Sequence, residues 1–68
     1  MTIAVMVNGQ PREVPADINV GQVVAAITEL ATGVAAAVNG EVVPRRFWDG
    51  TRLRDGDRVE VVTAVQGG

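Results

Sequence analysis

The strongest constraint on the fold is one apolar stripe at helical spacing, which runs through residues 20–31. Its members recur at i, i+3, i+4, i+7 and i+10 and are Val20, Val23, Val24, Ile27 and Leu30. Asn19 precedes the stripe and Gln22 follows three residues later, which matches a capping box, and Thr32-Gly33 supplies a stop signal. A chain of 68 residues can build only one small core. We therefore predict a core-facing helix, in preference to a helix that binds a partner.

Five short segments rich in β-branched and apolar residues are predicted as strands, over residues 2–7, 10–14, 34–38, 41–43 and 58–64. Asn8-Gly9 and Asn39-Gly40 are strong signals for two-residue hairpins. Pro11 places the second strand at a sheet edge, because proline cannot donate to a ladder. The order of elements predicts an α+β roll, with the helix on one face of a mixed four- to five-stranded sheet. Its first and last strands would lie parallel in the centre.

Period-two alternation assigns the strand residues to two faces of this sheet. The residues expected in the core are Val23, Val24, Ile27 and Leu30 of the helix with Ile3, Val5, Val59 and Val61 of the strands. The residues expected on the outer face are Ala4, Met6, Glu60, Val62 and Ala64. Exposed apolar patches mark partner sites. We therefore hypothesise that Met6, Val62 and Ala64 form a docking surface, against the alternative of scattered small apolar residues.

The segment Arg45-Arg46-Phe47-Trp48 holds both aromatic residues and a basic pair. It could be an adhesive surface patch, or a lid whose rings cover one end of the core. The two roles could also be divided, with one ring in the patch and the other in the lid. Asp49-Gly50 and Asp55-Gly56-Asp57 are predicted as turns. The two aspartates of the second turn could be imagined as a metal or acid–base site, but turn residues are the favoured interpretation. We predict no catalytic residue and no metal site.

Composition excludes several classes of function. The chain has no cysteine and no histidine, so thiol nucleophiles, imidazole bases and ordinary zinc sites are absent. A net charge of −2 argues against a nucleic-acid binder that depends on phosphate contacts. No apolar run is long enough for a membrane span, and the N-terminal residues resemble a strand more than a signal peptide. The lack of cysteine favours a cytoplasmic location.

The C-terminal residues Val65, Gln66, Gly67 and Gly68 follow the last predicted strand. Two terminal glycines add nothing to stability, since glycine loses the most entropy on ordering. We predict a domain over residues 1–64 and a flexible tail over residues 65–68, which spans about 13 Å when extended. Such a tail could carry the carboxylate of Gly68 into a narrow channel, gripped as an added strand.

The order of elements, the run Leu53-Arg54-Asp55-Gly56-Asp57-Arg58-Val59 and the terminal Gly67-Gly68 resemble the ubiquitin-like β-grasp sulfur carriers. Within that group, the run from Ala37 to Arg45 followed by Trp48 is similar to the sulfur carrier of thiamine thiazole synthesis. The resemblance spans the whole chain. One departure is Gln66, where a small residue is often expected, which could alter the fit in a partner's channel.

This resemblance implies a cycle in which the partners supply the chemistry. An E1-like adenylating enzyme would use ATP to activate the Gly68 carboxylate as an acyl-adenylate. Sulfur drawn from a cysteine desulfurase or sulfurtransferase would convert it to a thiocarboxylate, and a thiazole synthase would take the sulfur. The carrier itself would bind no cofactor and would not be an enzyme.

Three alternatives remain open at this stage. The small carrier subunit of molybdopterin synthase resembles this chain in fold and tail, although it is often longer. A ubiquitin-like protein modifier would instead become linked to lysines of other proteins. A plain β-grasp interaction module would have an incidental tail that is never modified.

Overall fold

The structure is a computed structural model that describes residues 1–29 and 33–63. Within these ranges the elements follow the order β1 (Thr2–Val7), β2 (Gln10–Pro15), α1 (Val20–Ile27), β3 (Val34–Val38), β4 (Glu41–Val43), the 3₁₀ helix η1 (Arg45–Gly50) and β5 (Arg58–Thr63). The predicted strands are confirmed, and β2 extends one residue further. The predicted end of the last strand, Ala64, lies outside the described residues.

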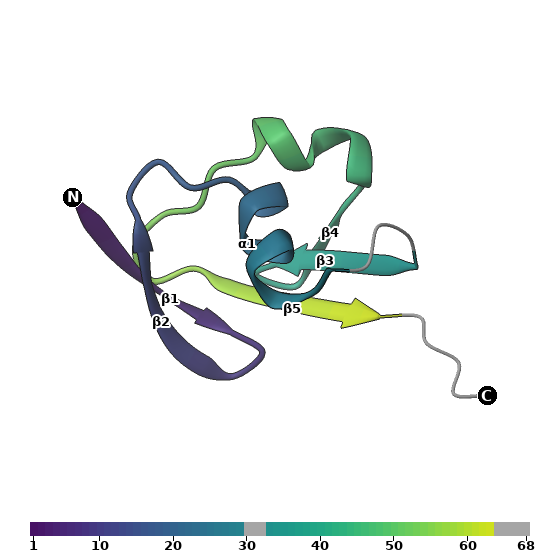
Figure 1. Cartoon of the computed structure of the whole chain (residues 1–68). Helices are drawn as coiled ribbons and strands as arrows, with labels where there is room; N and C mark the ends of the chain where they lie inside the picture. Colours follow the sequence, from purple (N-terminus) through teal and green to yellow (C-terminus); the bar gives the residue numbers. More distant parts are fainter. Residues whose placement is uncertain (30–32, 64–68) are drawn as a thin grey trace.

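The strands form one mixed sheet in the order β2-β1-β5-β3-β4 (Figure 1). The central pair, β1 and β5, is parallel, and the other pairs are antiparallel. Both hairpins turn at the predicted Asn-Gly pairs, with φ of 52° and 82° at Asn8 and Gly9 and of 52° and 86° at Asn39 and Gly40. Positive φ at both positions suits the right-handed twist of the flanking strands. The parallel centre and the edge position of β2 are therefore as predicted.

Helix α1 lies across one face of the sheet and begins at the predicted cap (Figure 1). The backbone N–H of Gln22 donates to Asn19 Oδ1 at 2.8 Å, and the backbone N–H of Asn19 donates to Gln22 Oε1 at 3.0 Å. The helix ends at Ile27, so the predicted end at residue 31 is wrong. Thr28 already has extended backbone angles, with φ of −145° and ψ of 152°. Two successive β-branched residues, Ile27 and Thr28, weaken a helix end, and the chain must leave α1 to enter β3.

The core lies between α1 and the sheet. Its buried side chains are Val5, Val7, Val14, Ile18, Val20, Val23, Val24, Ala36, Trp48, Leu53, Val59 and Val61. Of the predicted core residues, five are buried, and Ile3 and Ile27 are half-buried against the same cluster. The remaining one, Leu30, lies outside the described residues. No helix in residues 1–29 or 33–63 has the length and apolar character needed to cross a membrane.

Helix η1 closes one side of this core. Trp48 is buried at 6% exposure, and its Nε1 donates to the Val43 carbonyl at 2.8 Å, while Phe47 stays 51% exposed. Trp48 is therefore a lid residue and Phe47 a surface residue, which is the divided role considered from the sequence. The predicted turn at Asp49-Gly50 is wrong, because these residues form the last part of η1. The backbone N–H of Thr51 bonds back to the Trp48 carbonyl and ends the helix.

Candidate functional site

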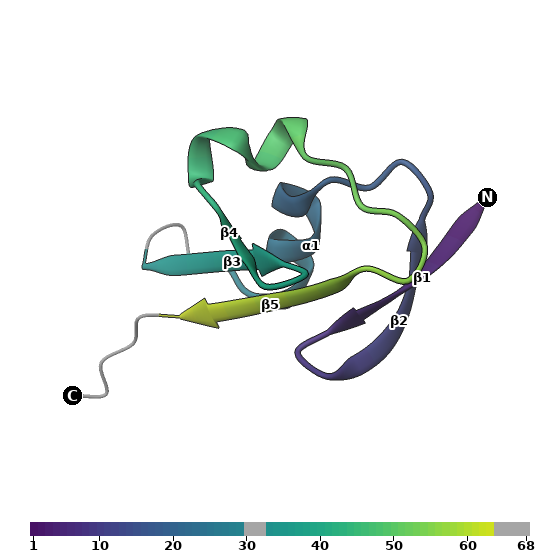
Figure 2. The same ribbon diagram turned by 180° about the vertical axis from the view of Figure 1, so that it is seen from behind.

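Strand β5 presents its residues alternately to the two faces of the sheet. Val59 and Val61 are buried toward α1, at 1% and 7% exposure, whereas Glu60 is exposed and Val62 is 61% exposed. Figure 2 views the sheet from the face opposite α1. The predicted alternation is therefore confirmed, and Val62 lies on the outer face, near the end of the last described strand.

Val62 belongs to a small apolar surface that three strands build together. In the sheet register Val62 pairs with Ala35, while Ala37 lies between Glu60 on one side and Val42 on the other. These side chains line a shallow depression of about 100 Å³. Val42 is 72% exposed, more than Val62 at 61%. We call the four apolar residues of this surface the outer patch, and its members are Ala35, Ala37, Val42 and Val62.

The other predicted docking residues are placed differently. Met6 is half-buried on β1, and it pairs with Arg58 at the beginning of β5, whereas Val62 lies near the other end of that strand. The structure therefore puts Met6 and Val62 on one face without making them neighbours. Ala64 lies outside the described residues. The predicted tail residues, Val65, Gln66, Gly67 and Gly68, also lie outside them.

Val42 and the two alanines of β3, Ala35 and Ala37, were not predicted from the sequence as surface partners of Val62. A signal for them was present. The Asn39-Gly40 turn fixes the register of β3 on β4, and alternation within Glu41–Val43 then sends Val42 to the face opposite Val43. What the sequence did not indicate was that β3 lies between β4 and β5, which brings Val42 and Val62 onto one surface.

The aspartates considered as a possible metal or acid–base site are held by a turn. Asp55 Oδ1 accepts from the backbone N–H of Ala4 at 2.8 Å, and Asp57 Oδ2 accepts from that of Arg54 at 2.8 Å. Gly56 between them has φ of 90°. Across residues 1–29 and 33–63, no group of three acidic side chains gathers in a way that could hold a metal ion. The turn interpretation therefore accounts for both aspartates.

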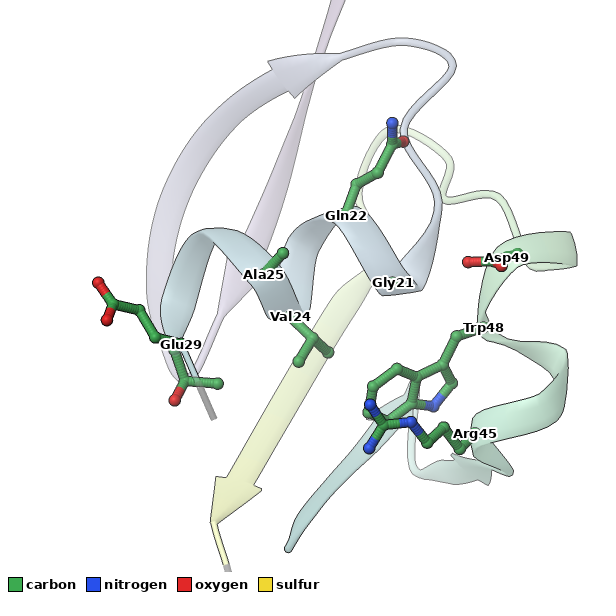
Figure 3. Close-up of a pocket in the computed structure, with 9 residues that line it drawn as sticks. Gly21, Gln22, Val24, Ala25, Glu29, Arg45, Trp48 and Asp49 are labelled. Carbon is green, nitrogen blue, oxygen red and sulfur yellow. The ribbon is translucent and has the colours of Figure 1, made fainter. Parts of the chain in front are cut away.

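A larger groove, of about 590 Å³, lies between α1 and η1 (Figure 3). The Arg45 guanidinium lies over the Trp48 ring on one side, with its carbon 5.1 Å from the ring centroid. Gly21 lies on the other side, where an added Cβ would meet Asp49 Oδ1 at 3.0 Å. The missing side chain at Gly21 therefore allows η1 to approach the first turn of α1. The groove combines an apolar floor with charges of both signs, and its residues include neither a nucleophilic thiol nor an imidazole.

The comparisons with known proteins agree with this arrangement of one helix on a five-stranded mixed sheet. A family model described as the ThiS family matches residues 5–68. The chain belongs to the ThiS family. The match extends over the β-grasp domain and over the terminal glycines, so the resemblance identified from the sequence is confirmed.

Two solved structures of a thiamine biosynthesis protein from Geobacter metallireducens resemble this member of the ThiS family. The crystal structure, of a protein named ThiS, is 34% identical, has a TM-score of 0.77, and is aligned over 97% of this chain and 100% of that one. The NMR solution structure is also 34% identical, with a TM-score of 0.76 and coverage of 97% and 88%. No curated protein sequence matches the chain. The ubiquitin-like β-grasp fold is thus shared with proteins of thiamine biosynthesis.

Proposed function

We propose that this protein is the sulfur carrier for thiazole formation in thiamine biosynthesis. The observation that carries the proposal is that the ThiS family match runs to residue 68 and so includes the Gly67-Gly68 end. The relatives' role in thiamine biosynthesis favours the thiamine branch over the molybdopterin branch. In this proposal the described sheet is the body of the carrier, and residues 65–68 form its reactive tail.

In this proposal Gly68 is the residue that is chemically modified. Its carboxylate oxygen attacks the α-phosphorus of ATP in an adenylating enzyme, which forms an acyl-adenylate and releases pyrophosphate. The terminal sulfur of a persulfide on a cysteine desulfurase or sulfurtransferase then attacks the acyl carbon, and AMP leaves. A thiol reduces the resulting acyl disulfide: it forms a disulfide with the donor cysteine and releases Gly68 as a thiocarboxylate, which a thiazole synthase uses as its sulfur source. Because ATP and these enzymes are needed, we place the protein in the cytoplasm.

We further propose that the outer patch docks the adenylating enzyme. Exposed valines such as Val42 and Val62 bury apolar area on association, and they lie on β4 and β5, on either side of β3. Met6 and Ala64 are proposed to extend this contact along the outer face. The tail residues Val65, Gln66, Gly67 and Gly68 would then enter the active site of the partner.

The proposal is tested by intact-mass analysis after incubation with ATP, the adenylating enzyme and a sulfur source. We expect a mass increase equal to the difference between one sulfur and one oxygen atom, located at Gly68. Deletion of Gly68 should abolish the increase, and so should one residue appended after Gly68, since the carboxyl group is then moved and held in an amide. A tag at Met1 is the control and should be tolerated. Sulfur loading of a variant that is verified to retain the residue appended after Gly68 would refute the carrier role.

The thiamine branch needs a separate measurement. The loaded protein is incubated with thiazole synthase in one reaction and with the large subunit of molybdopterin synthase in another. We expect consumption of the thiocarboxylate only in the first. Consumption only in the second would assign the chain to the molybdopterin branch, and lysine-linked adducts in cells would assign it to the protein modifiers.

A further inference from the structure

The side chain of Asn8 continues the pairing of β1 with β5 after β1 itself has ended. The backbone N–H of Asn8 donates to the Val59 carbonyl at 2.9 Å. Its side chain then makes two bonds to the next inward-facing residue, Val61. Asn8 Oδ1 accepts from the Val61 N–H at 2.8 Å, and Asn8 Nδ2 donates to the Val61 carbonyl at 3.2 Å. A carboxamide carries the same donor and acceptor as a peptide group, so Asn8 acts as one further unit of strand.

The backbone of β1 cannot make these bonds, because the chain reverses at Asn8-Gly9, where both residues have positive φ. Strand β5 runs on beyond the end of β1, as far as Thr63. On its other side β5 is paired with β3 up to the Val34–Thr63 pair. Asn8 therefore supplies the attachment of β5 to the β1 side of the sheet at Val61, close to where the described part of the chain ends.

The second Asn-Gly turn provides a matched comparison within the same molecule. Asn39 Oδ1 accepts from the Arg58 N–H at 3.0 Å, and Asn39 Nδ2 donates to Asp57 Oδ1 at 3.0 Å. Both asparagines have φ of 52°, and both use the side-chain amide to bind β5 or the residue just before it. They differ in position, because Asn39 binds the beginning of β5 and Asn8 binds its later half.

We propose that Asn8 is a positioning residue for the C-terminal tail, an inference that rests on the proposed carrier function. By holding Val61, Asn8 fixes the point from which the chain continues toward Gly68. Without this side chain, the last described part of β5 keeps its pairing with β3 and the packing of Val61, but it loses its hydrogen bonds on the β1 side and is held less firmly. A segment that is held less firmly loses more conformational entropy on docking. Loss of Asn8 therefore weakens productive binding to the adenylating enzyme and leaves the chemical step unchanged.

The test compares Asn8→Gly with Asn39→Gly, since glycine accepts the positive φ at either turn. Each variant loses two side-chain hydrogen bonds to the region of β5. For both variants, KM for the carrier protein and kcat are measured by pyrophosphate release with ATP, the adenylating enzyme and a sulfur source that consumes the acyl-adenylate. Hydrogen exchange of the Val61 and Arg58 amides reports, without any enzyme, which end of β5 has been released.

We expect Asn8→Gly to raise KM by about three- to tenfold, the range that one net hydrogen bond supplies. Its kcat should stay within about twofold of the wild type, and Val61 should lose exchange protection. Asn39→Gly should release Arg58 and leave KM near the wild-type value. A purely structural role for Asn8 predicts instead that both variants change KM alike.

An unchanged KM for Asn8→Gly, or an equal rise for both variants, overturns the inference. If Asn8→Gly does not fold, Asn8→Asp takes its place, because it tolerates the turn and keeps the bond from the Val61 N–H but removes the donor to the Val61 carbonyl. Its KM should also rise, and a wild-type KM overturns the inference. If the wild-type protein is not adenylated at all, the proposed function fails and the inference falls with it. If the wild-type protein is adenylated and the KM of the Asn8 variant is unchanged, the role of Asn8 is rejected and the proposed function stands.

Discussion

The two faces of β5 carry the same kind of side chain in different surroundings. Val61 and Val62 are neighbours in sequence, yet Val61 is 7% exposed and Val62 is 61% exposed. The inward valine packs under α1, whereas the outward one joins the outer patch. Residue type does not distinguish them, and only the register of the strand does. Stability and the proposed docking can therefore be probed separately at adjacent positions, which makes this pair a direct test of the proposed docking surface.

The largest effect is expected from a charge placed in the outer patch. Val62→Asp should lower kcat/KM for adenylation by about tenfold or more, because the carboxylate must be desolvated on docking. Its melting temperature should stay near that of the wild type, since Val62 is exposed. The control is Ala26→Asp, which adds the same charge at an exposed position of α1 on the other side of the sheet. Wild-type adenylation by Val62→Asp would remove the outer patch from the docking surface.

The adjacent inward position should show the opposite behaviour. Val61→Ala removes two buried methyl groups and should lower the free energy of unfolding by about 2 kcal/mol. Val62→Ala is the matched control and should change it by less than about 0.5 kcal/mol. Chemical denaturation measures both. We expect kcat/KM of Val61→Ala, determined where the protein is fully folded, to match the wild type, and a loss as large as that of Val62→Asp would contradict the division between the two faces.

The smallest effect is expected on the α1 side of the molecule. Gly21→Ala gains about 0.8–1 kcal/mol of helix propensity, but its Cβ would approach Asp49 Oδ1 at 3.0 Å and Asn19 Oδ1 at 3.3 Å. These effects oppose each other, so we expect a change in stability of less than about 0.5 kcal/mol. In an Asp49→Ala background the same substitution should become stabilising. Equal effects in both backgrounds would show that Asp49 does not restrict Gly21.

Features governed by local interactions could be predicted from the sequence. The two Asn-Gly turns, the Asn19 cap and the alternation along β5 depend on residues that are close together in the chain, and each lies where it was predicted. The end of α1 could not be predicted in this way. Leu30 continues the apolar stripe, but periodicity does not reveal that Thr28 leaves the helix to lead toward β3.

Features that depend on distant residues were missed for a physical reason. The outer patch could be predicted only from the order of the strands, since Val42 and Val62 lie on strands on either side of β3 and line one depression. The bonds of Asn8 to Val61 join residues 53 positions apart, and nothing near Asn8 in the sequence indicates them. The division of roles between Phe47 and Trp48 likewise depends on how η1 packs against α1. The predicted role of Gly68 rests on resemblance, because the residues that would act on it belong to other proteins.

The central parallel pair also determines the order in which this fold can be completed. Its two strands come from opposite ends of the described chain, with Met6 beside Arg58. Contacts so far apart in sequence form slowly, because loop-closure entropy opposes them. During synthesis β5 is the last described strand to leave the ribosome, and the two hairpins have no sheet between them until it arrives. A nascent chain therefore completes the described sheet only after β5 has been made.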